Sequence, residues 1–303
     1  MTHGPTVQPD VWTTRSLLSW IETHLAAKGI DEPLVTARWL VAHVLGTDPI
    51  HLYTDLERPA SADEREALRA LVLRAAASEP VQYMIGEAGF LGRLYEVTPD
   101  VLIPRTATES LVQIFDTWYR GIDPSDRDTS PWVADIGTGS GCVAISVALQ
   151  HATVQVVATD CSSQALKVAA GNIERHGVTD RVSCVLGDCC QPLGEFGRVG
   201  RYHAIVSNPP YIDDAHWGEL ADNVRRFEPE GALRGGGDGL TVVRRIIESA
   251  PGHLLPGGLL AIEVDDHHAA AGCKLLTQAG LHDARVIRDE HGDDRFVVAC
   301  QGD

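Results

Sequence analysis

The stretch Val133-Ala134-Asp135-Ile136-Gly137-Thr138-Gly139-Ser140-Gly141 decides the fold. Mostly apolar residues lead into three glycines at alternate positions, and an apolar segment follows at residues 142–149. This order is typical of a buried strand that turns through a glycine loop into a helix. Glycine lets the backbone approach a ligand closely, and the first turn of a helix leaves amide donors free. The stretch therefore predicts a ligand-binding loop in an α/β sheet.

Strands and helices alternate from this loop onward. We expect strands at residues 132–136, 154–159, 182–186, 203–207 and 258–264. Helices are expected between them, for example at residues 141–149 and 163–175. Such alternation is typical of a parallel sheet with helices on both faces. Two last segments, residues 284–287 and 295–300, predict an antiparallel hairpin at the sheet edge.

The residues before the loop have a different character. Apolar spacing predicts helices at residues 16–27, 34–45 and 61–77, and Ser61 with Glu64 has the spacing of a capping box. A hairpin within residues 81–105, a helix at 109–118 and a polar linker at 121–131 are expected next. We therefore predict three parts: a helical domain over 1–80, a β-hairpin linker over 81–105 and an α/β domain over 106–303.

Composition and charge exclude several classes of protein. The 303 residues are 44% hydrophobic and 22% charged, which indicates a globular chain and excludes a fibre or a wholly disordered protein. The net charge of −17 argues against nonspecific binding to nucleic acid. No apolar run approaches the roughly 18 residues of a membrane span, and residues 1–10 do not resemble a secretion signal. Seven cysteines without a Cys-x-x-Cys pair favour reduced thiols in the cytoplasm over disulfides or a zinc site.

Acidic residues at three successive strand ends indicate the ligand. Asp135, just before the glycine loop, would be poorly placed beside a pyrophosphate but suits a positively charged ligand such as S-adenosyl-L-methionine. Asp160 lies about 20 residues beyond the loop, where a carboxylate can accept hydrogen bonds from ribose hydroxyls. Asp188 ends the third strand, where it could accept from an adenine amino group. Any one of these residues alone could be a simple turn residue.

A second motif follows the fourth predicted strand: Asn208-Pro209-Pro210-Tyr211. The prolines fix φ and lack N–H groups, so they stiffen the loop. The Asn208 side-chain oxygen and the Pro209 carbonyl can then accept both hydrogens of a planar –NH2 group, on which Tyr211 can stack. Positioning and electrostatics of this kind suffice for in-line methyl transfer to nitrogen. Taken alone, the motif could also be a rigid loop.

The sequence resembles the HemK/PrmC family, the peptide chain release factor glutamine N(5)-methyltransferases, over nearly the whole chain. The tetrapeptide is shared with DNA adenine and N4-cytosine methyltransferases, but other matching segments are specific. The matching residues are 79–83 with Gly86, 97–105, 135–141, Asp160, Asp188, 208–212, Glu228-Pro229 and 232–240. The resemblance implies a Rossmann-like class I S-adenosyl-L-methionine-dependent methyltransferase domain. It also implies that the helical domain over residues 1–80 holds a release factor whose Gly-Gly-Gln glutamine is methylated.

The resemblance also implies site residues. The expected catalytic residues are Asn208, Pro209, Pro210 and Tyr211, and these four with Arg105 are expected to bind the substrate. The expected cofactor-binding residues are Asp135, Gly137, Thr138, Gly139, Ser140, Gly141, Asp160, Asp188, Cys189 and Asn208. Cys189 stands where the family often has a tryptophan.

Several alternatives remain open from the sequence. A ribosomal-protein glutamine methyltransferase, a nucleic-acid amine methyltransferase and a catalytically silent adaptor of the same fold are the competing functions. We expect no metal site, because the polar run at residues 265–268 is interpreted as a solvated loop at a strand end. We further expect a monomer that contacts neither nucleic acid nor a membrane.

Overall fold

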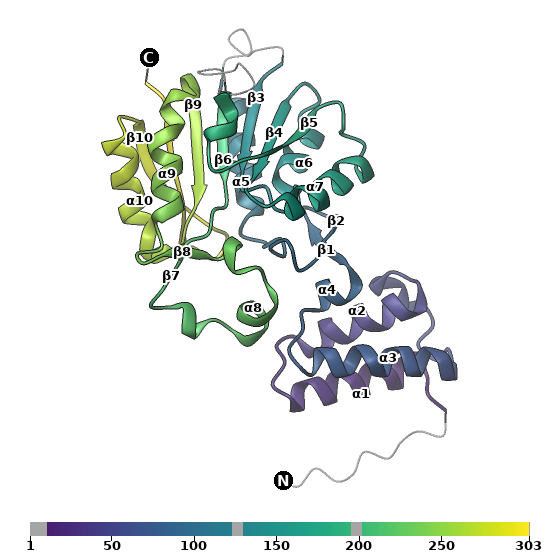
Figure 1. Cartoon of the computed structure of the whole chain (residues 1–303). Helices are drawn as coiled ribbons and strands as arrows, with labels where there is room; N and C mark the ends of the chain where they lie inside the picture. The colour runs from purple at the N-terminus through teal and green to yellow at the C-terminus, as the bar shows by residue number, and fades with distance from the viewer. Residues whose placement is uncertain (1–10, 123–129, 195–201, 303) are drawn as a thin grey trace. The chain divides into compact units, whose positions relative to one another are not determined.

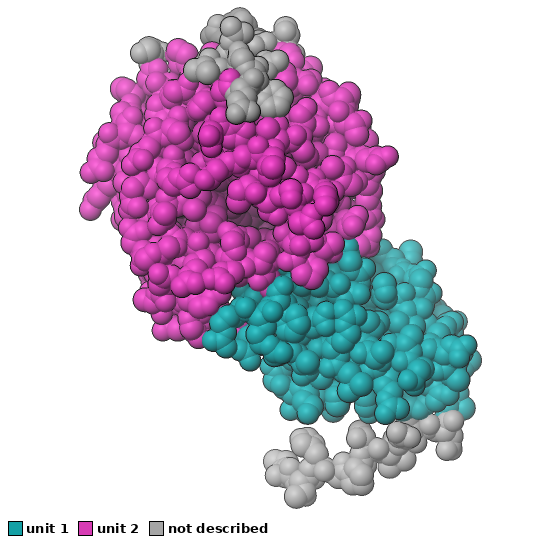
Figure 2. Space-filling view, in the orientation of Figure 1, with its two compact units in different colours: residues 1–86, 222–227 teal, residues 87–221, 228–303 magenta. Residues whose placement is uncertain are grey.

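A computed structural model describes residues 11–122, 130–194 and 202–302 (Figure 1). The chain divides into two units: Met1–Gly86 with Asp222–Phe227, and Glu87–Ala221 with Glu228–Asp303 (Figure 2). Each unit buries apolar side chains of its own, with one cluster in the first unit and two in the second. None of the described helices combines the length and the apolar character needed to cross a membrane.

Amphipathic helices build the first unit. α1 (Thr14–Ala27), α2 (Pro33–Leu45) and α3 (Ala62–Ala75) pack through buried side chains such as Leu25 and Leu40. The predicted capping box is confirmed: the Ser61 hydroxyl accepts from the Glu64 N–H, and the Glu64 carboxylate accepts from the Ser61 N–H. The shorter helices of this unit are η1 (Pro49–Thr54), α4 (Val81–Ile85) and α8 (Asp222–Phe227).

A short hairpin opens the second unit. β1 (Glu87–Phe90) and β2 (Arg93–Glu96) pair antiparallel around Leu91 and Gly92, which both have positive φ as a two-residue hairpin turn requires. The hairpin expected within residues 81–105 therefore occupies 87–96, and the first residues of that range form helix α4 instead. The hairpin is held to the sheet domain by Tyr95, whose hydroxyl lies 2.9 Å from that of Ser146 in α6.

Seven strands form the central sheet, in the order β10-β11-β9-β6-β3-β4-β5. The pairs from β9 through β6, β3 and β4 to β5 are parallel, while β11 pairs antiparallel with β9 and β10. The strands are β3 (Trp132–Ile136), β4 (Gln155–Asp160), β5 (Val182–Leu186), β6 (Tyr202–Ser207), β9 (Leu254–Glu263), β10 (His282–Arg288) and β11 (Asp294–Cys300). The predicted parallel sheet and its edge hairpin are confirmed.

Helices cover both faces of this sheet (Figure 1). α5 (Glu109–Gly121), α6 (Cys142–Gln150) and α7 (Ser163–Arg175) bury their apolar sides against one face. α9 (Thr241–Ser249) and α10 (Asp266–Gln278) pack on the other. The strand order reverses direction at β3, so the carboxyl ends of β3 and β6 border the crevice where such sheets bind ligands.

Three features differ from the sequence-based expectation or fall outside it. The interpretation of residues 265–268 as a loop is wrong. Asp265 is the N-cap of α10, and its side chain accepts a hydrogen bond from the His267 N–H. A small second sheet pairs β7 (Ile212–Asp213) with β8 (Arg234–Gly236). Most of the predicted linker at 121–131 lies outside the described residues, and its first residue ends α5.

The remaining short helices are η2 (Gln191–Gly194), η3 (Trp217–Glu219), η4 (Glu230–Ala232) and η5 (Ala250–Gly252).

Candidate active site

The glycine loop connects the carboxyl end of β3 to α6, as the sequence predicts. Gly141 has a φ of +82°, and an added Cβ there would lie 3.3 Å from the Ala169 Cβ, so both backbone conformation and packing favour glycine. Asp135 is buried below the loop and accepts from the Thr138 hydroxyl at 2.7 Å and the Ala144 N–H at 3.1 Å. Burial raises the pKa of Asp135 to about 6. This carboxyl group therefore fixes both the loop and the start of α6.

The carboxylate of Asp160 supports the loop from the neighbouring strand. Asp160 ends β4 and accepts from the Gly139 N–H at 3.0 Å and the Ser162 N–H at 2.9 Å. Burial raises its pKa above the usual range. Each carboxylate oxygen has two lone pairs, so both oxygens can accept a further hydrogen bond from a ligand.

A cavity of about 270 Å³ lies where these elements meet. The predicted site residues that line it are Arg105, Asp135, Gly137, Thr138, Gly139, Ser140, Asp160, Asn208 and Pro210. The predicted site residues outside its lining are Gly141, Asp188, Cys189, Pro209 and Tyr211. Two carboxyl groups and a bare glycine backbone suit a compact ligand that carries positive charge and hydroxyl donors. The cavity therefore fits the chemistry of S-adenosyl-L-methionine.

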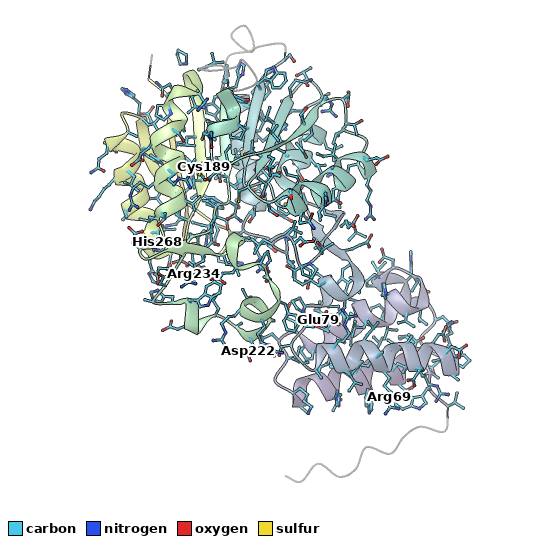
Figure 3. All side chains as sticks on the ribbon, in the orientation of Figure 1. Arg69, Glu79, Cys189, Asp222, Arg234 and His268 are labelled. Carbon is cyan, nitrogen blue, oxygen red and sulfur yellow. The ribbon has the colours of Figure 1, made fainter. Side chains whose placement is uncertain are left out.

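Asp188 and Cys189 lie apart from this cavity lining. The Asp188 carboxylate forms an ion pair with Arg245 of α9 at 2.6 Å and accepts from the Cys189 thiol at 3.2 Å. This ion pair holds the pKa of Asp188 below its usual range. Cys189, labelled in Figure 3, has a φ of +49° in the turn after β5. The roles of Asp188 and Cys189 beside an adenine remain predictions.

The Asn208-Pro209-Pro210-Tyr211 segment follows β6, directly beside the end of β3. The Ser207 hydroxyl donates to the Ile136 carbonyl at 2.7 Å and joins the ends of the two strands. The Asn208 Nδ2 donates to the Thr108 Oγ1 at 3.0 Å, so the other side-chain atom of the amide, Oδ1, is left for a ligand. The Tyr211 hydroxyl donates to the Glu263 Oε1 at 3.3 Å, and burial raises the tyrosine pKa above its usual range.

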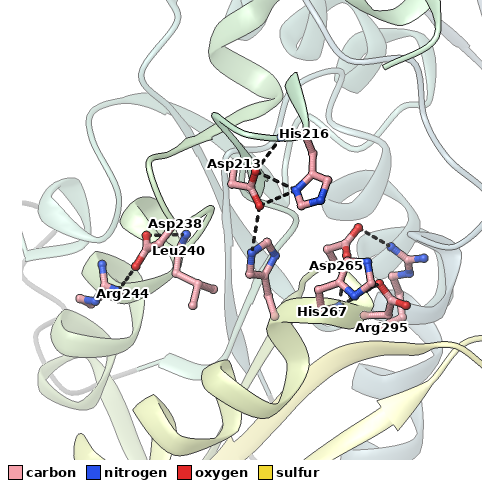
Figure 4. A network of polar contacts seen from close by, with 10 residues as sticks. Asp213, His216, Asp238, Leu240, Arg244, Asp265, His267 and Arg295 are labelled. Atoms are coloured by element: carbon pink, nitrogen blue, oxygen red, sulfur yellow. Dashed lines mark hydrogen bonds and ion pairs between the residues drawn. The ribbon is translucent and has the colours of Figure 1, made fainter. Parts of the chain in front are cut away.

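The glycine-rich segment at residues 232–240 packs against the same loop. A Cβ added at Gly235 would lie 2.8 Å from the Tyr211 Cα, and one at Gly239 would lie 2.5 Å from the Tyr211 carbonyl oxygen. Glycines are therefore required at these two positions because two backbone segments touch, and this contact fixes the position of Tyr211. Beyond Tyr211, the Asp213 carboxylate of β7 contacts the His216 side chain (Figure 4).

An ion pair joins two further parts of the cavity wall. The Arg105 guanidinium lies 2.5 Å from the Glu228 Oε1, and the Glu228 Oε2 accepts from the Ile103 N–H at 3.3 Å. Only 1% of the Glu228 side chain is exposed, against 36% for Arg105. This pair fixes the segment that carries the predicted substrate residue Arg105.

Thr108, Glu228 and Glu263 have no role predicted from the sequence. Thr108 and Glu228 lie in or next to segments that match the family, and Glu263 ends the fifth predicted strand. Their acidic or hydroxyl side chains at the edges of motifs were the only available signal. The structure places all three in buried contact with the site.

This sheet, with a glycine loop after β3 and an amide acceptor after β6, defines an S-adenosyl-L-methionine-dependent methyltransferase. Residues 16–86 match the family described as PrmC N-terminal domain, and residues 107–235 match the methyltransferase small domain. Release factor glutamine methyltransferase from Geobacter sulfurreducens is 38% identical, with 96% of this chain and 98% of that protein covered. The protein of the same name from Bordetella pertussis is 44% identical, with 87% and 93% covered. The chain belongs to the release factor glutamine methyltransferase family.

The fold also recurs in a solved structure of low sequence identity. The hMettl16 catalytic domain, crystallised in complex with the MAT2A 3'UTR hairpin 6, is 17% identical to this chain. The TM-score is 0.50, with 75% of this chain and 90% of that chain covered. This likeness confirms the methyltransferase fold alone.

Proposed function

We propose that this protein methylates the side-chain amide nitrogen of the glutamine in the Gly-Gly-Gln motif of peptide chain release factors. The observation that carries the proposal is the orientation of Asn208, whose Nδ2 is bound by Thr108 while the residue lines the cavity. An Oδ1 in this position can accept an N–H of a carboxamide. Family membership supports the release factor as the protein that supplies this carboxamide.

The residues of the chain act by binding and orienting the two reactants. Asp135, Asp160 and the backbone at Gly137 and Gly139 would hold S-adenosyl-L-methionine in the cavity. When bound, this cofactor supplies an electrophilic methyl group. The positive charge of its sulfonium and ammonium groups is matched by the two carboxyl groups.

The glutamine nitrogen is a weak nucleophile because its lone pair is delocalised into the carbonyl group. Asn208 Oδ1 and the Pro209 carbonyl accept its two N–H hydrogens, which increases electron density on the nitrogen and fixes the orientation of the amide. The nitrogen bonds to the methyl carbon as the bond from that carbon to sulfur breaks, and it then releases one of its two protons. Pro209 and Pro210 keep this loop rigid, so little reorganisation is needed at the moment of reaction. The Tyr211 hydroxyl is bound by Glu263, and its ring would pack beside the amide plane of the substrate.

Methyl transfer to the release factor tests the proposal directly. Wild-type protein incubated with tritiated S-adenosyl-L-methionine should label a release factor, and mass spectrometry should find the extra methyl on the Gly-Gly-Gln peptide. Asn208→Ala should lower the rate about a hundredfold to a thousandfold, as loss of one preorganised polar contact does in other enzymes. Equal labelling by wild type and Asn208→Ala would refute the assigned mechanism. Label on a ribosomal protein or on nucleic acid alone would favour those alternatives, and no cofactor binding at millimolar concentration would favour the silent adaptor.

We propose further that the helical first unit holds the release factor. Support comes from a groove of about 620 Å³ on α1 and α3, lined by Trp20, Leu73 and Arg69 among others. Leu73, which lines this groove, is 63% exposed, so its side chain is accessible to a partner. Leu73→Asp should raise the KM for intact release factor several-fold, while the rate with a short Gly-Gly-Gln peptide stays unchanged. An equal KM for intact release factor in the wild type and in Leu73→Asp would contradict this role.

Three further expectations concern the compartment, the substrate class and the oligomeric state. All seven cysteines lie in the described residues and are free thiols, which supports a reducing compartment such as the cytoplasm. The net charge of −17 supports a protein substrate over nucleic acid. Light scattering after gel filtration would test the proposed monomer.

A further inference from the structure

Thr108 occupies a helix N-cap but does not cap the helix. It precedes α5, is only 4% exposed, and makes no side-chain hydrogen bond to the first turn of that helix. Its Oγ1 instead accepts the hydrogen bond from Asn208 Nδ2. A hydroxyl that accepts in this way still has one hydrogen to donate. Thr108 therefore needs a buried acceptor.

Glu263 provides that acceptor at the end of β9. The residue is 1% exposed, and its Oε1 accepts from the Tyr211 hydroxyl. Its Oε2 is buried and has no hydrogen-bond partner within the described residues. The Thr108 side chain lies close enough to lower the pKa of this carboxyl group. The unpartnered Glu263 Oε2 and the remaining Thr108 hydroxyl hydrogen thus belong to two buried side chains that lie close together.

We propose that Thr108 and Glu263 are positioning residues that determine which atom of the Asn208 amide faces the cavity. An ionised Glu263 accepts the Thr108 hydrogen, so Thr108 must accept from Asn208 Nδ2 and the Oδ1 faces the substrate. A protonated Glu263 can instead donate to Thr108, whose own hydrogen then suits Asn208 Oδ1. The amide turns over, and Nδ2 meets the N–H groups of the glutamine, to which it cannot bond.

This proposal deepens the proposed function, because it rests on a carboxamide substrate bound by Asn208. Burial, opposed by the groups around it, places the titration of Glu263 in the neutral range. Burial raises the pKa of the Glu263 carboxyl group to about 7, despite the opposing effects of Thr108, Arg295, Tyr211 and Arg105. Arg295 reaches it from β11, and Arg105 from the segment before α5. The productive orientation is therefore favoured above neutral pH.

Steady-state kinetics on release factor between pH 6 and pH 8.5 tests this relay of hydrogen bonds from Glu263 through Thr108 to Asn208. Wild-type kcat should rise with an apparent pKa near 7. Thr108→Val, which keeps the shape but removes the hydroxyl, should lower kcat about tenfold to a hundredfold and abolish this pH dependence. Thr108→Ser should restore both, and Glu263→Gln should give a kcat independent of pH. Thr117→Val, an exposed threonine on the same helix, is the control and should match wild type.

A second readout does not require activity. The sequence holds three asparagines, Asn172, Asn208 and Asn223, so protein labelled with 15N-asparagine gives few side-chain amide signals. The Asn208 signal, assigned by its loss in Asn208→Ser, should shift with pH near neutrality in wild type and stay constant in Thr108→Val. A signal that titrates equally in both proteins overturns the proposal, as does a Thr108→Val enzyme with wild-type kcat or pH profile. A titrating signal in a protein that never labels release factor would refute the proposed function and leave the relay intact.

Discussion

Replacement of Arg105 by methionine tests whether the cavity wall depends on the ion pair with Glu228. Methionine keeps an unbranched apolar stem at this position but leaves the Glu228 carboxylate, 1% exposed, with only the Ile103 N–H as a described partner. Removing one partner of a fully buried pair costs about 3–5 kcal/mol, whereas exposed pairs contribute about 0–1 kcal/mol. Because 36% of the Arg105 side chain is exposed, we expect a loss of about 2–3 kcal/mol in the free energy of unfolding of the second unit.

Urea denaturation measures this loss, and hydrogen exchange of the β3 and β6 amides assigns the transition to the sheet. The midpoint of that transition should fall by about 1 M. The double variant Arg105→Met/Glu228→Gln should recover at least half of the loss, since it leaves no unpaired charge. Arg244→Met is the matched control: it breaks a 2.7 Å pair with Asp238 in which both side chains are more than a third exposed, and should cost at most about 1 kcal/mol. A loss for Arg105→Met no larger than that of the control, or a double variant no more stable than the single one, would refute the reasoning.

Three other predictions follow from contacts around the cavity. Asp160→Ala should raise the Kd for S-adenosyl-L-methionine about tenfold to a hundredfold by calorimetry, because it removes a carboxylate acceptor; an unchanged Kd would remove this residue from the cofactor site. Gly239→Ala should lower kcat because its Cβ would lie 2.5 Å from the Tyr211 carbonyl oxygen, whereas Gly237→Ala, with no atom within 4 Å of the added Cβ, should keep the wild-type rate. Glu263 keeps its proton up to about pH 7 in the folded protein, but loses it near pH 4.5 in the unfolded chain. This group therefore lowers the free energy of unfolding, on the order of 3 kcal/mol in all, as the pH rises from about 4.5 to about 7. Glu263→Gln should remove that slope in urea titrations, and an unchanged slope would contradict the burial argument.

Regular apolar segments made most of the fold predictable. The strands at 132–136 and 182–186 and the helix at 163–175 were predicted to the residue, because each is bounded by glycine, proline or a capping serine. α10 was missed because it begins with three polar residues, although Asp265 before them is a typical N-cap. Helix α9 and the small β7–β8 sheet were not located either. Short strands of this kind are set by tertiary contacts and leave little periodicity to detect.

The candidate site was only partly predictable, for a different reason. Asp160 and Asn208 stand at strand ends, where topology alone places them at the crevice. Thr108 contacts Asn208 across 100 residues of sequence, and Glu263 contacts Tyr211 across 52. Their roles depend on side-chain hydrogen bonds between distant elements. A single sequence carries no record of such pairings.

The hydrogen bond between Ser207 and Ile136 has a consequence for how the protein is made. These two residues lie side by side at the crevice, yet 71 residues separate them in the chain. At a synthesis rate of about 5–20 residues per second, the glycine loop leaves the ribosome roughly 4–14 s before the segment that carries Asn208. During that interval the nascent chain has the loop but no β6 beside β3. The site of this chain can therefore be complete only after β6 has been made, since this later strand pairs with β3 in the middle of the sheet.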